Sequence, residues 1–373
     1  MSLSTLSVPA ANGEQDKIKK IVDSSIVPLM KKFRIAGMAI GISSKGKRYV
    51  FNYGVVSLAT QKPVTDNSLF EIGSVSKTMT GTLASYAQVN GRLSLTDKTD
   101  KYLPELTGTN FGNLTLLNLA THTSGGLPLQ LPLSVTNNDQ LMEYLKHWKP
   151  KCEPGTVRNY ANPGIGMLGF ITAKCMKQNF DELMETSLFS GLGMSHSYIK
   201  VPATERQNYV QGYTENDSPV RMTNGVLSSE AYGVKTTVSD MIRFIEANMS
   251  VVKFDEKLQR AILDTHTGYF KTRAMTQDLI WEQYTIPVQQ NVLLDGNSKS
   301  MIFESTAVTQ ITPPEKPRSD VWINKTGSTA GFGAYVAFIP KDQIGIVILA
   351  NKTYPIPQRL LAAQNIIKQL SNI

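Results

Sequence analysis

Residues Phe70-Glu71-Ile72-Gly73-Ser74-Val75-Ser76-Lys77 place a serine and a lysine, Ser74 and Lys77, three positions apart. On a helix these positions share a face, so the lysine amine can reach the serine hydroxyl and help remove its proton. The apolar residues of this region recur at helical spacing, at Val75, Met79, Leu83 and Tyr86. They predict a buried helix that begins near Ser74. The free N–H groups at such a helix start would stabilise an oxyanion beside the serine.

Ser-x-x-Lys on its own is a weak signal, because the chain repeats it at Ser44, Ser197 and Ser250. The pair at Ser44 is explained by a tight turn, Ser44-Lys45-Gly46-Lys47, between two predicted strands. An isolated pair of this kind is normally a solvated serine beside a surface lysine. Ser74 is distinguished by its helix and by two motifs further along the chain.

The composition indicates a folded protein with a large core. The chain has 373 residues, of which 41% are hydrophobic and 18% charged, enough for one large domain or two lobes. It contains no run of about 18 or more apolar residues, so we expect no membrane span. Lysine and arginine are scattered along the chain, so we expect no nucleic-acid partner. The net charge of +8 can still attract an anionic small molecule.

Neither the cysteines nor the histidines form a metal-binding pattern. The spacing of Cys152 and Cys175 allows a single disulfide bridge but does not establish one. The four histidines include no His-x-x-x-His pair and are interpreted as hydrogen-bonded structural residues. We therefore expect neither a metal nor a cofactor.

The order of the predicted elements indicates an α+β fold. Near the N-terminus the patterns predict one helix and two strands, over 15–34, 36–43 and 48–57. Near the C-terminus they predict three strands and a last helix, over 321–326, 333–339, 343–350 and 357–370. Short turns between the late strands indicate an antiparallel meander.

The middle of the chain is predicted to be mostly helical. Helical patterns cover 114–124, 138–148, 164–176, 181–188 and, further on, 237–249. Residues 209–232 form a long polar stretch, and loops of this length in a compact protein are usually functional or disordered. We expect an α/β lobe built from residues 1–90 and 220–373, a mostly helical lobe over 91–219, and an active site between them.

The second motif, Tyr160-Ala161-Asn162, follows a loop with proline and glycine and precedes a predicted helix. Two nearby lysines would favour the phenolate of Tyr160, because positive charge stabilises the charged form. Tyr160 could then exchange protons with the serine, the leaving group and a water. Asn162 carries a donor and an acceptor that can orient an amide and steady Lys77. The alternative interpretation is a packed tyrosine beside an asparagine that caps the helix.

The third motif, Lys325-Thr326-Gly327-Ser328, lies on a predicted strand. Lys325 can bind a substrate carboxylate there, with help from the hydroxyl of Thr326 or Ser328. Gly327 has no side chain, so the strand can approach a ligand closely. An edge strand would also offer free N–H and C=O groups to a ligand that contains an amide. The alternative interpretation is an ordinary edge strand with a solvated lysine.

Taken in this order, the three motifs resemble the active-site plan of serine β-lactamases and penicillin-binding proteins, whose set is Ser-x-x-Lys, Ser-Asp-Asn and Lys-Thr-Gly. The tyrosine of the middle motif is similar to that of class C β-lactamases, the AmpC-type cephalosporinases. The resemblance covers nearly the whole chain, including 121–126, 231–235 and 331–340. It implies the family fold, an antiparallel sheet flanked by helices beside a mostly helical lobe.

The resemblance also implies roles for individual residues. Ser74 would be the acylated nucleophile, and Lys77 and Tyr160 would share general-base and general-acid work. The backbone N–H groups of Ser74 and Ser328 would form the oxyanion hole. The substrate would be held by Gln130 and Asn162 at its side-chain amide, by Tyr232 beside that side chain, and by Lys325 and Thr326 on the carboxylate side.

One position departs from the family pattern. Many members carry an asparagine shortly after the last strand, where it helps to bind the substrate carboxylate, and Ile356 occupies that place here. Carboxylate recognition would then rest on Lys325 and Thr326, with Arg359 as a further candidate.

The resemblance implies a monomeric enzyme that hydrolyses cephalosporins and penicillins, and thereby a role in antibiotic resistance. Two alternatives on the same scaffold stay open: a D-alanyl-D-alanine carboxypeptidase or esterase, and a penicillin-binding sensor that remains acylated. Residues 1–14 lack the basic and apolar regions of a signal peptide, which fits either a cytoplasmic protein or a mature exported one. Since family members are exported, we expect the periplasm.

Overall fold

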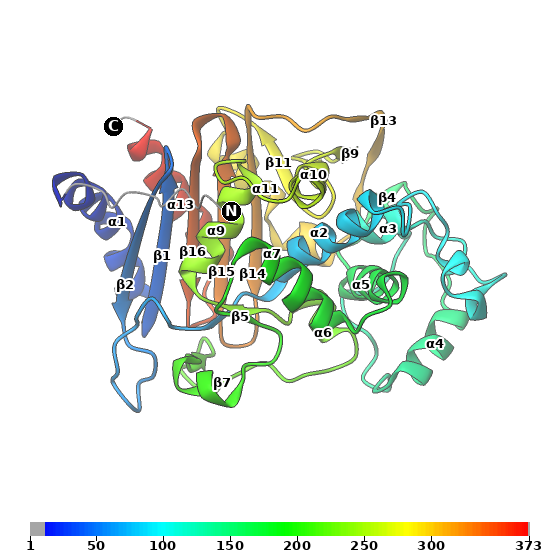
Figure 1. Cartoon of the computed structure of the whole chain (residues 1–373), viewed down its shortest axis with the longest axis horizontal. Helices are drawn as coiled ribbons and strands as arrows, with labels where there is room; N and C mark the ends of the chain where they lie inside the picture. Colours follow the sequence, from blue (N-terminus) through cyan, green and yellow to red (C-terminus); the bar gives the residue numbers. More distant parts are fainter. Residues whose placement is uncertain (1–11, 372–373) are drawn as a thin grey trace.

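The computed structural model describes residues 12–371, and its central element is a nine-stranded antiparallel sheet (Figure 1). The strands lie in the order β13-β9-β10-β11-β14-β15-β16-β1-β2. Their bounds are β1 Gly37–Ser44, β2 Lys47–Gly54, β9 Gly268–Lys271, β10 Thr276–Gln277, β11 Glu282–Thr285, β13 Thr309–Glu315, β14 Val321–Ser328, β15 Gly333–Ile339 and β16 Ile344–Ala350. The antiparallel pairing of β14, β15 and β16 confirms the meander predicted near the C-terminus.

Helices cover both faces of this sheet (Figure 1). α1 (Asn12–Phe33) and α13 (Ile356–Leu370) pack on one face, and α9 (Val238–Asn248) packs on the other. Gly41 and Gly345 let α9 approach closely, because a Cβ on either would lie 2.5 Å from an isoleucine of that helix. The helices predicted at the two ends of the chain and the two N-terminal strands are thus confirmed.

Four helices from the first half of the chain contribute to a third cluster of buried apolar residues, at one end of the molecule (right in Figure 1). They are α2 Ser76–Val89, α3 Leu116–Ala120, α4 Asn138–His147 and α5 Asn162–Met176. α2 packs against α5 and α10 and therefore connects this cluster to the region beside the sheet. The division of the chain into lobes at residues 90 and 220 stays a prediction.

The other elements are short. The helices among them are α6 Phe180–Leu183, a π-helical turn Met184–Phe189, α7 Ser190–Leu192, α8 Ser228–Tyr232, α10 Glu256–Asp264, α11 Gln290–Gly296 and α12 Lys299–Phe303. The 3-10 turns are Gly73–Val75, Thr99–Lys101, Pro104–Leu106, Ala203–Asn208 and Pro340–Asp342. The short strands are β3 Phe70–Glu71, β4 Val157–Arg158, β5 Ser197–Tyr198, β6 Gly212–Tyr213, β7 Pro219–Val220, β8 Lys235–Thr236 and β12 Thr306–Ala307.

Two predicted elements are longer than the observed ones. The helix predicted over 114–124 is only α3, because Thr115 caps its start and His122, which follows its end, has a positive φ of 61°. The strand predicted over 48–57 ends at Gly54, which also has a positive φ. A Cβ on Gly54 would collide with the carbonyl oxygen of Ala36, so the chain turns there on the one residue that fits.

Three chemical features of the fold bear on function. Cys152 and Cys175 are both free thiols, so the bridge that their spacing allowed is not formed. Within residues 12–371, no helix is both long enough and apolar enough to cross a membrane. The same part of the chain holds no group of three or more His, Cys, Asp or Glu side chains arranged to bind a metal ion.

Candidate active site

The three motifs meet at a cavity of about 310 Å³. The residues predicted for the site that line it are Ser74, Gln130, Tyr160, Asn162, Lys325, Thr326, Gly327 and Ser328. Lys77 lies directly behind Ser74, and Tyr232 lines a neighbouring cavity of about 260 Å³ together with Gln130 and Asn162. The structure therefore brings together the residues of the three motifs with Gln130 and Tyr232.

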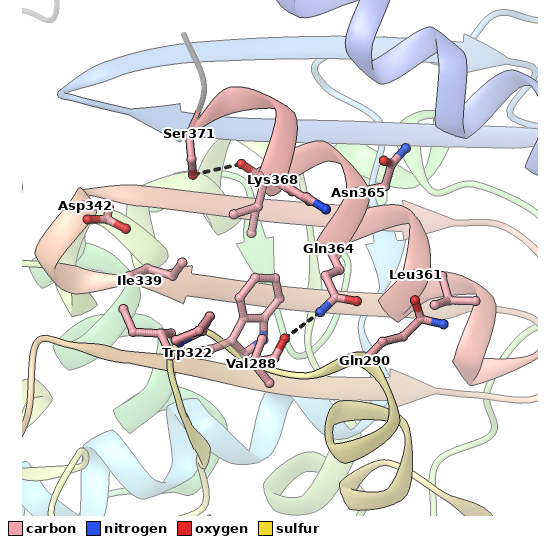
Figure 2. Close-up of a pocket in the computed structure, with 13 residues that line it drawn as sticks. Val288, Gln290, Trp322, Ile339, Asp342, Leu361, Gln364, Asn365, Lys368 and Ser371 are labelled. Carbon is pink, nitrogen blue, oxygen red and sulfur yellow. Dashed lines mark hydrogen bonds between the residues drawn. The ribbon is translucent and has the colours of Figure 1, made fainter.

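A larger groove, of about 780 Å³, lies between α13 and the sheet (Figure 2). Trp322 and Ile339 form its floor, and Gln364 of α13 donates a hydrogen bond to the carbonyl of Val288 across it, at 3.1 Å. None of the residues predicted for the site lines this groove. The three motifs therefore point to a cavity smaller than this groove.

Ser74 lies in the 3-10 turn Gly73–Val75, immediately before α2 begins at Ser76. The turn places Ser74 and Lys77 on one face, and the ammonium of Lys77 donates hydrogen bonds to Ser74 Oγ at 2.8 Å and to the carbonyl of Ala231 at 2.9 Å. The same nitrogen lies 5.3 Å from the centre of the Tyr160 ring. The predicted serine–lysine contact is thus present.

Lys77 is fully buried, and this burial determines its acidity. Loss of hydration lowers the pKa of Lys77 to about 8; the phenol of Tyr160 opposes this shift, and the cation of Lys325 adds to it. A lysine with such a pKa releases its proton far more easily near neutral pH than a solvated lysine does. It can therefore act as a base toward Ser74.

Tyr160 is held among cations. Burial alone would raise the pKa of its phenol, but the ammonium groups of Lys325 and Lys77 and the hydroxyl of Ser74 outweigh burial and lower that pKa to about 8. The Lys325 nitrogen lies 5.1 Å from the centre of the ring. Because Tyr160 and Lys77 have similar pKa values, a proton can pass between them at little cost.

A buried network of charged side chains lies next to Tyr160. Its members belong to no sequence motif, and the sequence did not predict it. Arg158 donates to Glu282 Oε1 at 3.2 Å, to Gln277 Oε1 at 2.7 Å and to the carbonyl of Met301 at 2.7 Å. The same oxygen of Glu282 lies 3.7 Å from the Lys325 nitrogen. Glu282 therefore links two of the three cations that lie near the phenol, Arg158 and Lys325. The one available signal was the spacing of Arg158 and Tyr160, which places both on one side of an extended segment.

His122 is a second residue that the sequence did not select. Its Nδ1 accepts a hydrogen bond from the Ala161 N–H at 3.2 Å, and its ring centre lies 4.4 Å from that of Tyr160. Burial, together with the nearby cations, holds the pKa of His122 well below its ordinary value. His122 is therefore neutral and supports the Tyr160 ring by packing, in agreement with the structural role expected for the histidines.

The nucleophile turn and the end of β14 are in direct backbone contact. A Cβ on Gly73, whose φ is +51°, would lie 2.5 Å from the carbonyl oxygen and 2.6 Å from the nitrogen of Ser328. A Cβ on Gly327 would collide with the carbonyl oxygen of Ile72. The missing side chain of Gly327 thus makes room for the Ser74 turn; Gly327 also lines the cavity, and the close approach to a ligand that the sequence suggested stays a prediction.

β14 is an edge strand only over its last residues. It lies between β11 and β15 in the sheet, but β11 pairs only with Val321 to Asn324. From Lys325 onward the only partner of β14 in the nine-stranded sheet is β15. The free edge expected for this motif is therefore present where the cavity lies.

Two of the predicted substrate-binding residues, and the residue that departs from the family pattern, have specific surroundings. Asn162 is buried and its Oδ1 makes no hydrogen bond within the described structure; Lys77 bonds to Ala231 instead of to Asn162, so the predicted contact between them is not formed. Gln130 is exposed at the mouth of the cavity. Ile356 lines the cavity from the start of α13.

Arg359 does not face the cavity. Its guanidinium is buried and donates to the carbonyl of Gly327 at 2.6 Å, to Ser328 Oγ at 2.9 Å and to the carbonyl of Tyr354 at 2.6 Å. It therefore supports the end of β14 from behind, and it is unsuited to the carboxylate contact considered from the sequence.

Comparison with known proteins agrees with this geometry. The family model described as Beta-lactamase matches residues 22–371. The chain belongs to the beta-lactamase family. It is 47% identical to the beta-lactamase of Pseudomonas fluorescens, over 95% of this chain and 99% of that protein. It is 48% identical to the beta-lactamase of Lysobacter lactamgenus, over 93% of this chain and 90% of that protein.

Solved structures place the chain in the AmpC-type class C group of this family. A class C beta-lactamase in complex with cefoxitin superposes with a TM-score of 0.93 at 49% identity, covering 95% of this chain and 99% of that one. The D-alanine carboxypeptidase AmpC from Burkholderia cenocepacia superposes with a TM-score of 0.91 at 53% identity, with the same coverage. The fold class and the family resemblance inferred from the sequence are therefore confirmed.

Proposed function

We propose that this class C β-lactamase opens the β-lactam ring of cephalosporins and penicillins through an acyl-enzyme on Ser74. The observation that carries the proposal is the 2.8 Å hydrogen bond between Lys77 and Ser74 Oγ, in a cavity where Tyr160 has a pKa of about 8. A serine hydroxyl needs a neighbouring base to become a nucleophile, and these two groups supply one.

In the acylation step, Ser74 Oγ bonds to the lactam carbonyl carbon while its proton moves to the deprotonated member of the Lys77–Tyr160 pair. The carbonyl oxygen takes up negative charge, which the N–H groups of Ser74 and Ser328 stabilise. Collapse of this intermediate breaks the ring C–N bond. The departing nitrogen takes a proton from Tyr160, so the step conserves charge and protons.

In the deacylation step, a water attacks the ester carbon of acyl-Ser74. Its proton moves to the same Lys77–Tyr160 pair, and the second tetrahedral intermediate uses the same N–H groups. Collapse breaks the C–Oγ bond, and Ser74 recovers its proton from the pair. The pair is thus regenerated in its starting state, as turnover requires.

Substrate recognition is proposed for residues on two sides of Ser74. Gln130, Asn162 and Tyr232 would contact the acyl side chain, and the buried, unpaired Oδ1 of Asn162 offers an acceptor for its amide N–H. Thr326 and Lys325 would attract the carboxylate. Lys325 is only 1% exposed and lies beside Glu282, so we propose that it acts through its field and that Thr326 makes the direct contact.

The test is purified protein mixed with a chromogenic cephalosporin. We expect many turnovers per protein molecule, complete loss in Ser74→Ala, and an acyl adduct on the peptide that contains Ser74. One stoichiometric burst followed by arrest would instead indicate a penicillin-binding sensor. Sustained cleavage of D-Ala-D-Ala peptides with little β-lactam turnover would favour the peptidase, the activity named for the Burkholderia cenocepacia neighbour.

We further propose that the protein acts as a monomer in the periplasm. The support is the family membership of the chain, since members of this family are exported. Residues 1–11, where a leader would be sought, lie outside the described residues. Cell fractionation and the mass in solution by light scattering test the two statements separately.

A further inference from the structure

Glu71 is a buried carboxylate that the proposed chemistry does not use. It is 1% exposed and lies in β3, three residues before Ser74. Oε1 accepts hydrogen bonds from the hydroxyl of Tyr209 at 2.5 Å and from the Met222 N–H at 2.9 Å. Oε2 accepts a hydrogen bond from the hydroxyl of Thr329 at 2.5 Å. One side chain therefore receives three donors from two separate parts of the chain.

The three donors come from the segments that enclose the nucleophile. Tyr209 and Met222 belong to the polar stretch 209–232. Near the end of this stretch, the carbonyl of Ala231 accepts a hydrogen bond from the ammonium of Lys77. Thr329 directly follows Ser328, whose backbone lies against Gly73. Glu71 thus ties the segment behind Lys77 and the end of β14 to the strand that leads into Ser74.

A carboxylate suits this position because it only accepts hydrogen bonds, and it can serve several donors at once. Hydrogen bonds to a charged acceptor are also shorter and stronger than neutral ones. Burial, together with the neighbouring Glu71, raises the pKa of Tyr209, so its phenol stays protonated and donates. Lys235, the residue opposite Glu71 in β8, donates to the carbonyls of Ile199 and Gly233. Glu71 therefore interacts with the three hydrogen-bond donors and does not form an ion pair with Lys235.

We propose that Glu71 is a positioning residue: it sets the distance between the Ser328 N–H and Ser74, and it fixes the 209–232 segment that carries the Lys77 acceptor. The backbones of Gly73 and Ser328 are packed so closely that not even a Cβ would fit between them. A shift of Thr329 would therefore also move the N–H group of Ser328, the proposed oxyanion donor. Misplacement of a reacting group by about 1 Å can cost about 100-fold in rate. This inference rests on the proposed acyl-enzyme chemistry at Ser74.

The test uses Glu71→Gln, in which an NH₂ group replaces one of the two carboxylate oxygens. Both oxygens accept hydrogen bonds in the wild type, so the NH₂ group must face a group that now donates to Glu71. The readouts are the rate constant for acylation by a fluorescent penicillin and the inhibition constant of phenylboronic acid, which forms a tetrahedral adduct with an active serine. We expect acylation to fall by about 10- to 100-fold and phenylboronic acid binding to weaken by a similar factor.

Thr329 and Glu246 supply the matched controls. Thr329→Val removes one arm of the network without touching Glu71, and should slow acylation and weaken phenylboronic acid binding; Thr329→Ser keeps the hydroxyl and should restore both. Glu246 is an equally buried carboxylate of α9 that accepts from Ser43 at 3.0 Å and from Arg48 Nε at 2.7 Å, and neither it nor these partners line the cavity. Glu246→Gln should lower the melting temperature without changing either readout.

Thr329→Val decides the outcome if Glu71→Gln does not fold. Folded Thr329→Val that is acylated and inhibited as wild type would overturn the proposal, as would folded Glu71→Gln with unchanged constants. A wild-type protein that no penicillin acylates would instead overturn the proposed function, so the two failures are distinguishable.

Discussion

Replacing Arg158 with methionine should both weaken the fold and shift the acidity of Tyr160. Arg158 is buried and donates three hydrogen bonds, of which the one to Glu282 is an ion pair. Removing one partner of a buried ion pair typically costs about 3–5 kcal/mol, because the other charge stays buried. Glu282 keeps two partners, Lys325 at 3.7 Å and the Asn324 amide at 3.1 Å. We therefore expect a loss of about 3 kcal/mol, the lower end of that range.

The effect on catalysis follows from the charge that remains. The carboxylate of Glu282 already opposes the lowering of the Tyr160 pKa, and Arg158 neutralises part of its charge. Without Arg158, the pKa of Tyr160 should rise above 8. The base form of the Lys77–Tyr160 pair is populated as pH rises, so the ascending limb of kcat/KM should move to higher pH.

Two measurements check this prediction: urea unfolding of wild type and Arg158→Met, and pH profiles of cephalosporin hydrolysis for the same proteins. Adding Glu282→Gln to Arg158→Met should recover part of the stability and return the limb toward its original position, since the unpaired charge is then gone. A free energy of unfolding within about 0.5 kcal/mol of wild type, or a limb that stays in place, would refute the reasoning.

Three further predictions concern single side chains. Tyr160→Phe should slow acylation and deacylation by about 10²- to 10⁴-fold, the usual contribution of general acid–base catalysis; stopped-flow kinetics giving near wild-type rates would contradict the role of the phenol. Burial raises the pKa of Asp278 well above its ordinary value, so this carboxyl costs stability as pH rises above about 4. Asp278→Asn should therefore raise the melting temperature at pH 7–8 but not at pH 4, and an equal change at both pH values would contradict this. Ile356→Asn should lower KM for a β-lactam carboxylate but not for its ester, and equal KM changes would place Ile356 away from the carboxylate.

The residues that the sequence predicted for the site are those whose chemistry depends on local spacing. Ser74 and Lys77 meet because a helical turn separates them, whatever the rest of the fold does. Tyr160 and Lys325 belong to short motifs that occur once each, and their order along the chain indicated a shared cavity. The strands and helices at both ends of the chain were similarly readable, because β1, β14, β15 and β16 are short apolar runs bounded by turns and the two terminal helices have apolar residues at helical spacing.

The network around the phenol could not be predicted, because its members come from distant segments without a motif. Arg158 and Glu282 are 124 residues apart, and nothing in their local sequence indicates that they meet. Residues 255–320 were also left without prediction, since β9, β10 and β11 are only two to four residues long and lack a clear alternation. Such short strands are stabilised by pairing with their neighbours in the sheet, β9 with β13 and β10, and β11 with β10 and β14, which is a tertiary effect.

Gly327 shows how the structure can add a second reason for a residue that the sequence selected. The motif suggested that the strand can approach a ligand closely at Gly327, which stays a prediction; the structure shows in addition that a Cβ there would collide with the carbonyl oxygen of Ile72. Only the three-dimensional path of the Ser74 turn reveals this contact, since a glycine in a strand pattern is compatible with either neighbour.

The charges of the site explain why a buried phenol can serve as a base. Lys77, Lys325 and Arg158 bring three cations near the Tyr160 ring, and Glu282 is the one carboxylate that contacts two of them. An unbalanced buried charge is costly, so the site favours any change that adds negative charge. Deprotonation of Tyr160 adds one such charge, and an anionic substrate adds another. We therefore expect the same excess of cations that lowers the pKa of the phenol to favour binding of a β-lactam carboxylate, and a variant that removes one cation should weaken both effects together.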